Sequence, residues 1–192
     1  MKAVKALPEG YREIYTLDLQ KDKKMLILVN LLAIAIFVLM AVPMSWLVPV
    51  YTLFGAQGDM GDFNLKMGAV LVLLVLYMVL HELVHGIAMK MCGTEKVRYG
   101  FTGMYAFACS DDYYNKKAYI FIALAPIVLW GVVLAVINLL VPLEWFWVFY
   151  FIQIGNISGA AGDLFVTLRF WGFPEDMLVK DYGVGMTVYS RK

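Results

Sequence analysis

The sequence predicts an all-α integral membrane protein with about four transmembrane helices and a small cytosolic β-hairpin loop between the second and third. Of its 192 residues, 62% are hydrophobic, and the mean hydropathy is +0.73. Soluble domains are closer to half apolar. Four apolar stretches are each about long enough to cross the hydrocarbon core of a bilayer, and basic residues gather on one side of all four. These observations favour a single domain of a few helices surrounded by lipid.

The four apolar stretches run approximately over residues 25–50, 67–91, 118–141 and 145–170. Each is expected to be a helix, because an open strand cannot satisfy its backbone polar groups in lipid. The first stretch contains Pro43 and Pro49, so its outer end should be kinked or should end early. The last begins with a cluster of aromatic residues, which is typical of the membrane interface.

Lysines and arginines predict the orientation of the spans. They precede the first span, flank the loop between the second and third, and follow the fourth, at Lys21, Lys23, Lys24, Lys90, Lys96, Arg98, Lys116, Lys117, Arg169, Lys180, Arg191 and Lys192. The other two connections hold one lysine, Lys66, against Asp59, Asp62 and Glu144. Both termini and the long middle loop are therefore expected in the cytosol, as in a multi-pass protein of the cell membrane.

The polar segments predict three regions: a cytosolic N-terminal segment at 1–24, a four-helix transmembrane domain at 25–170 and a cytosolic C-terminal tail at 171–192. The middle loop is rich in aromatic and β-branched residues and is broken by Gly100 and Gly103, a pattern that predicts the hairpin. The sequence DYGVGMTVYS in the C-terminal tail alternates as a strand would.

The composition argues against several other classes of protein. A net charge of +1 gives no basis for a nucleic-acid partner. Cys92 and Cys109 lack the spacing of a zinc knuckle and are expected to remain reduced thiols in the cytosol. About two dozen mostly polar residues precede the first apolar stretch and no small-residue cleavage site follows it, so we expect no cleavable signal.

The second span contains the sequence His81-Glu82-Leu83-Val84-His85, and these are the only two histidines in the chain. Residues i and i+4 share one face of a helix, so both imidazoles can bind one metal ion. A catalytic zinc ion takes three protein ligands and a water, and Glu82 would be the general base that activates the zinc-bound water. The alternative is a polar network that ties helices together. Three ionisable groups in one turn of a membrane helix are expensive without a partner, which favours the metal site.

Asp163 is the candidate third ligand. It is the only acidic residue within the fourth span, and it lies at nearly the same depth as the two histidines, roughly 10 Å from the cytosolic surface. Gly155 and Gly159 would let the helices approach closely enough for a short aspartate to reach the ion. The alternative is a buried carboxylate paired with another polar group.

Asn156 and Pro126 are candidate substrate-binding residues. Asn156 lies two turns before Asp163 on the same helix face and could hydrogen-bond a substrate carbonyl or the oxyanion. Pro126 lies within the third span and leaves a backbone carbonyl without its helical partner, which could help to position a substrate. A plain interhelical hydrogen bond and a simple kink are the respective alternatives.

The order of these features resembles the three-helix core of the site-2-protease family of intramembrane zinc metalloproteases: a span with HELVH, a hairpin loop, a span with Ala-Pro and a span with a glycine-flanked aspartate. More closely, the chain resembles small bacterial proteins that are described as putative zincin peptidases of unknown function. The resemblance covers about residues 67–170, and the first span is an addition. It implies zinc bound by His81, His85 and Asp163, Glu82 as the base, and a bacterial plasma membrane.

The sequence is compatible with two main functions. The first is an intramembrane zinc metalloendopeptidase that hydrolyses peptide bonds of transmembrane or membrane-associated protein substrates near the cytosolic side. The second is a non-catalytic metal-binding membrane protein that binds and regulates membrane partners. Glu82 favours the first, because a purely structural zinc site does not need it. An ion pathway is a third and weaker alternative, since the sequence has no inverted repeat. The substrate and the oligomeric state are left open.

Overall fold

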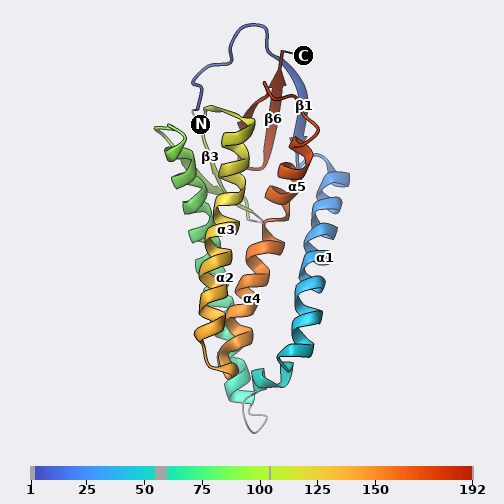
Figure 1. Ribbon diagram of the computed structural model, residues 1–192, viewed down its shortest axis with the longest axis vertical. Coiled ribbons are helices and arrows are strands. Elements are labelled where there is room, and N and C mark those ends of the chain that lie inside the picture. The colour runs from blue at the N-terminus through green and yellow to red at the C-terminus, as the bar shows by residue number, and fades with distance from the viewer. Residues whose placement is uncertain (1–2, 55–59, 104, 192) are drawn as a thin grey trace. The chain divides into compact units, whose positions relative to one another are not determined.

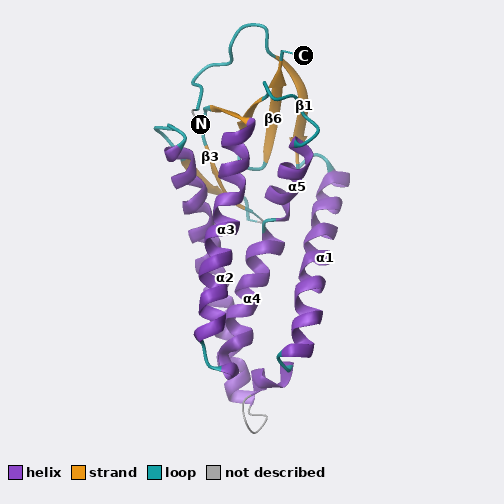
Figure 2. Cartoon of the chain, viewed as in Figure 1, coloured by secondary structure: helices purple, strands orange, loops and turns teal. Residues whose placement is uncertain are grey.

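The computed structural model describes residues 3–54, 60–103 and 105–191, and these are mostly helical (Figures 1 and 2). The helices are α1 Lys23–Leu47, η1 Val50–Phe54, α2 Met60–Met91, α3 Lys116–Leu140, η2 Leu143–Trp145, α4 Phe146–Gly159 and α5 Ala161–Phe170. The strands are β1 Arg12–Asp18, β2 Arg98–Phe101, β3 Ala106–Cys109, β4 Tyr113–Asn115, β5 Leu178–Asp181 and β6 Gly185–Ser190. The chain is therefore mostly helical with small antiparallel sheets, where the sequence predicted an all-α protein.

Within the described residues, three helices are long and apolar enough to cross a membrane, namely α1, α2 and α3. Their presence indicates that the chain associates with a membrane. The predicted fourth span is instead two shorter helices, α4 and α5, because Ala160 leaves the helical conformation with φ −88° and ψ 21°. Pro43 lies inside α1, which ends at Leu47, just before Pro49.

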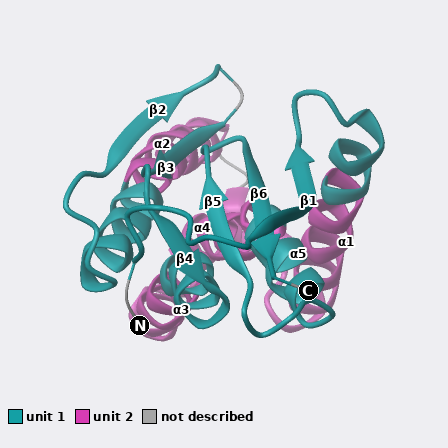
Figure 3. Ribbon diagram, turned by 90° about the horizontal axis from the view of Figure 1, so that it is seen from above, with its two compact units in different colours: residues 1–29, 80–126, 162–192 teal, residues 30–79, 127–161 magenta. Residues whose placement is uncertain are grey.

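The chain folds into two compact units (Figure 3). The first unit comprises residues 1–29, 80–126 and 162–192, and the second comprises residues 30–79 and 127–161.

The first unit contains both sheets. Four strands form an antiparallel sheet in the order β1-β6-β5-β4, and β2 pairs with β3. Strands β1 and β6 pair from Arg12 opposite Ser190 to Asp18 opposite Gly185, so segments near the two chain ends are direct neighbours. The sequence predicted a strand near β6 but missed β1. Leu17 is the only fully buried side chain of β1, so the strand shows little hydrophobic alternation.

The second unit is a helical core. Val70 of α2, Leu134 of α3 and Val148 and Ile152 of α4 are buried against one another. Lys66 is 1% exposed, and its ammonium donates to the Asp62 carboxylate and to the Thr52 carbonyl. The one lysine predicted on the outer side is therefore neutralised by an ion pair and a backbone oxygen.

Gly155 sets how closely α2 and α4 approach each other. A Cβ atom at Gly155 would lie 3.0 Å from Leu74 Cδ2, whereas one at Gly159 would meet nothing within 4 Å. We expect Gly155→Val to destabilise the protein by about 1–3 kcal/mol through overpacking. The thermal unfolding midpoint in detergent measures this effect. Gly159→Val is the matched control in the same helix, and an equal loss in both variants would contradict the close-approach argument.

Candidate metal centre

His81, His85 and Asp163 come together in the first unit. Their nearest potential ligand atoms all lie within 4.8 Å of one another. Nε2 of each histidine lies 3.7 Å from Asp163 Oδ2. Ligand atoms of a tetrahedral zinc ion with bonds of about 2.0–2.1 Å are about 3.3 Å apart, so a small contraction would complete the site. Two imidazoles and one carboxylate are a donor set that suits zinc and leaves a coordination position open.

Helix geometry explains how the three side chains meet. His81 and His85 lie one turn apart on α2, with ring centroids 4.8 Å apart and planes at 78°, and both are buried. Asp163 lies in the first turn of α5, directly after the break at Ala160. The first turn of a helix has free N–H groups and the positive end of the helix dipole, both of which favour a carboxylate. The break that splits the predicted fourth span therefore also suits the placement of Asp163.

Pro126 provides the hydrogen-bond acceptor that orients His85. In a helix the carbonyl of residue 122 would accept from the N–H of residue 126, but proline has no N–H. The Ile122 carbonyl instead lies 2.9 Å from His85 Nδ1. A carbonyl can only accept, so Nδ1 carries the proton and Nε2 keeps its lone pair for a metal. The sequence predicted that Pro126 frees a carbonyl; the structure shows that this carbonyl holds a metal-ligand candidate.

Glu82 lies half-buried beside the three ligand candidates, and its carboxylate interacts electrostatically with His81, His85 and Asp163. Glu82 therefore shares the electrostatic environment of the three ligand candidates.

Tyr119 and Asp181 are further polar residues near the site that the sequence did not predict. Asp181 Oδ2 accepts a hydrogen bond from the Tyr119 hydroxyl, and Oδ1 accepts one from the Gly183 N–H at 2.6 Å. Burial raises the pKa of the Asp181 carboxyl, opposed by these two hydrogen bonds and by the charge of His85. The sequence predicted one strand over DYGVGMTVYS, whereas Asp181 ends β5 and the chain turns at Gly183 before β6, so no local signal connects Asp181 with the histidines.

Asn156 belongs to the second unit, where both ends of its amide are engaged. Its Oδ1 accepts from the Tyr77 hydroxyl at 2.8 Å, and its Nδ2 donates to the Ile127 carbonyl at 3.1 Å. Its side chain is fully buried. This is the interhelical arrangement that was the alternative to substrate binding. The substrate-binding roles of Asn156 and Pro126 stay predictions.

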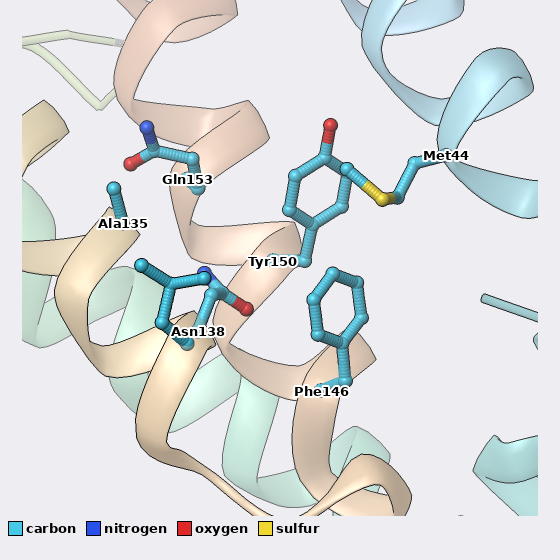
Figure 4. A pocket seen from close by; sticks show the side chains of 7 residues that line it. Met44, Ala135, Asn138, Phe146, Tyr150 and Gln153 are labelled. Atoms are coloured by element: carbon cyan, nitrogen blue, oxygen red, sulfur yellow. The ribbon is translucent and has the colours of Figure 1, made fainter. Parts of the chain in front are cut away.

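The second unit also contains a cavity of about 260 Å³ between α1, α3 and α4 (Figure 4), lined by Met44, Ala135, Asn138, Leu139, Phe146, Tyr150 and Gln153. The amide nitrogen of Asn138 donates to the Leu134 carbonyl, and that of Gln153 donates to the Gly131 carbonyl. None of the lining residues is a histidine or a carboxylic acid, so this cavity is separate from the candidate metal ligands.

Comparison with known proteins identifies the class. The family model described as "Putative zincin peptidase" matches residues 74–178, more than half of the chain, and the chain belongs to this family. The matched segment includes His81, Glu82, His85 and Asp163. The family description indicates a zinc-dependent metallopeptidase. No curated protein matches the chain. No solved structure matches it either.

Removing a ligand candidate should remove the metal. We expect His85→Ala and Asp163→Ala to lose most of the zinc that the wild-type protein binds, because two remaining ligands cannot complete the site. Elemental analysis of detergent-purified protein measures zinc per chain. Asp111→Ala, which changes an exposed carboxylate paired with Arg98, is the control and should keep the metal. Full zinc content in Asp163→Ala would contradict the proposed ligand set.

Replacing Pro126 should separate metal affinity from stability. Pro126→Ala restores an N–H that competes with His85 for the Ile122 carbonyl. We expect about tenfold weaker zinc binding, the usual result of losing an outer partner of a metal ligand, together with an unchanged or higher unfolding temperature, because an interior proline destabilises a helix. Competition with a fluorescent zinc chelator measures the affinity.

Pro43→Ala is the matched control, since Pro43 also lies inside a long apolar helix. Its zinc affinity should equal that of the wild-type protein. Equal affinities in both proline variants would show that the freed carbonyl does not orient His85.

Proposed function

We propose that this protein is a site-2-protease-like intramembrane zinc metallopeptidase that cuts transmembrane or membrane-associated proteins near the cytosolic side. The observation that carries the proposal is the gathering of His81, His85 and Asp163 beside Glu82 on α2, one of the helices that could span a membrane. Membership in a zincin peptidase family supports the peptidase chemistry. The position of the histidines within an apolar helix supports catalysis at membrane depth.

The pairing of the strands supports four membrane crossings. Strand β1 precedes α1 and pairs with β6, which follows α5. Strand β4 lies between α2 and α3 and pairs with β5 in the same sheet. Hydrogen-bonded strands must lie on one side of a membrane, so the number of crossings between them is even. If α1, α2 and α3 cross, then α4 and α5 together must supply the fourth crossing.

This topology agrees with the distribution of basic residues. Both termini and the sheet would then lie on the cytosolic side of a bacterial plasma membrane, where lysine and arginine are retained. The hydrogen bonds of the sheet therefore support placing both ends and the middle loop on one side, and the basic residues support that this side is the cytosol.

Each of the four site residues has a separate role in the proposed reaction. His81, His85 and Asp163 would hold the zinc ion, and the Ile122 carbonyl would keep His85 in the tautomer that binds it. When bound, zinc lowers the pKa of a coordinated water and polarises the scissile carbonyl. Glu82 takes the proton from the attacking water and returns it to the leaving amine nitrogen.

The substrate must locally unwind before cleavage. A peptide bond inside a transmembrane helix has its N–H and C=O in helical hydrogen bonds, and water is scarce in the hydrocarbon core. A site roughly 10 Å from the cytosolic surface would require only the end of a substrate helix to open. The proposal therefore predicts cleavage near the cytosolic end of a substrate span.

Glu82→Gln should separate metal binding from catalysis. We expect normal zinc content, because Glu82 is not a ligand, and a loss of hydrolysis of about 100-fold or more, because the general base is gone. Zinc-loaded protein in detergent is tested on dye-labelled casein and on quenched-fluorescence peptides that contain a membrane-spanning segment. Glu95→Gln, an exposed carboxylate, is the control.

The alternative function makes the opposite prediction. A non-catalytic metal-binding protein would hydrolyse neither probe with zinc bound, and Glu82→Gln would leave its cellular phenotype unchanged. That combination would overturn the proposed peptidase activity.

A further inference from the structure

The cavity between α1, α3 and α4 is lined by two amides whose oxygens have no hydrogen-bond partner. The amide nitrogen of Asn138 donates to the Leu134 carbonyl at 3.0 Å. That of Gln153 donates to the Gly131 carbonyl at 3.3 Å. A carbonyl can only accept, so these bonds fix which end of each amide is the oxygen. Asn138 Oδ1 and Gln153 Oε1 are both buried, and neither has a partner among the described residues.

The hydroxyl that lines the cavity is already engaged elsewhere. Tyr150 carries the only hydroxyl among the described lining residues, and it donates to the Met40 carbonyl at 3.2 Å. An unpartnered amide oxygen costs free energy in apolar surroundings, and water is scarce in the hydrocarbon region of a membrane. The two amide oxygens are therefore acceptors for a molecule that brings its own donors.

The cavity lies at one end of the helices that form it. Met44 is in the last turn of α1, Asn138 is in the last turn of α3, and Phe146 is the first residue of α4. Gln153 lies about 10 Å further along α4. The ends of membrane-spanning helices lie where the hydrocarbon core gives way to the headgroups. The cavity therefore covers the depth at which the glycerol and ester groups of a lipid lie.

The lining of the cavity suits an uncharged amphiphile. Figure 4 shows the amides of Asn138 and Gln153 on one side and the rings of Phe146 and Tyr150 on the other. None of the described lining residues is charged, so none forms an ion pair with a phosphate or an ammonium group. Leu139, which also lines the cavity, is 84% exposed, so a lipid can reach the cavity from the surface.

The size of the cavity favours part of a lipid over a protein helix. Its volume of about 260 Å³ is slightly below that of a site for a drug-sized molecule, about 300–1,000 Å³. A helix is about 10 Å across with its side chains and is too wide to enter. The head and the first carbons of an acyl chain are of the right size.

We propose that this cavity binds a lipid whose uncharged head carries free hydroxyl groups, the chemistry of a monoacylglycerol. The hydroxyls donate to Asn138 Oδ1 and Gln153 Oε1, and the acyl chain packs against the rings of Phe146 and Tyr150. The site lies in the second unit and does not depend on the proposed peptidase function. A lipid that binds only the folded protein stabilises it, so the unfolding temperature rises with lipid concentration.

The test compares two lipids that differ only in their donors. Full-length protein is purified in an amine-oxide detergent, which has no hydrogen-bond donor, and is titrated with monoolein or with methyl oleate. Native mass spectrometry measures the bound fraction, and the unfolding midpoint is followed in parallel. We expect monoolein to bind about tenfold more tightly or more, because methyl oleate has the same chain and ester but no hydroxyl.

Three variants and a control assign the binding to this cavity. Asn138→Leu and Gln153→Met keep the side-chain size but remove one acceptor each, so each should weaken monoolein about fivefold and leave methyl oleate unchanged. Ala135→Phe keeps both amides but fills the space, so it should weaken both lipids. Ser45→Ala is the control: Ser45 is next to Met44, but its hydroxyl donates to the Val42 carbonyl and does not line the cavity.

Three results would overturn the proposal. The first is equal binding of monoolein and methyl oleate by the wild-type protein. The second is a preference for monoolein that Asn138→Leu and Gln153→Met both retain in full. The third is displacement of monoolein by an equal concentration of phosphatidylcholine, whose head has no donor, or by a membrane-spanning peptide that contains threonine, which would assign the cavity to a different occupant.

Discussion

The main constraint on this structure is a free-energy cost. The imidazoles of His81 and His85 and the carboxylate of Glu82 lie within about one turn of α2, an apolar helix. In a membrane-spanning segment such groups need partners that are themselves fixed. The chain provides these partners at two points where a helix is irregular. Ala160 interrupts the last apolar stretch and places Asp163 in a first helical turn, and Pro126 leaves the Ile122 carbonyl free for His85. The irregularity at Pro126 leaves a carbonyl that contacts a ligand candidate, and the irregularity at Ala160 precedes the helix that carries Asp163.

The same constraint accounts for the sheet in the first unit. A metal centre built from α2 and α5 requires segments far apart in the sequence to keep a fixed relation. The antiparallel sheet provides it by joining strands from near both ends of the chain, through the pairing of β1 with β6 and of β4 with β5. Its buried core includes Ala88 and Met89 of α2 and Val166 and Phe170 of α5, so the sheet and the helices that bear the ligands share one core.

The sequence predicted the parts of the structure that local pattern controls. Three apolar stretches became long helices, the middle loop contains the β2–β3 pair, and the HExxH spacing and the lone acidic residue of the last span identified side chains that the structure brings together. It could not predict β1, because a strand with one buried residue has no clear alternation. It could not predict that Asp181 lies near the site either, because that position depends on the packing of distant segments rather than on neighbours in sequence.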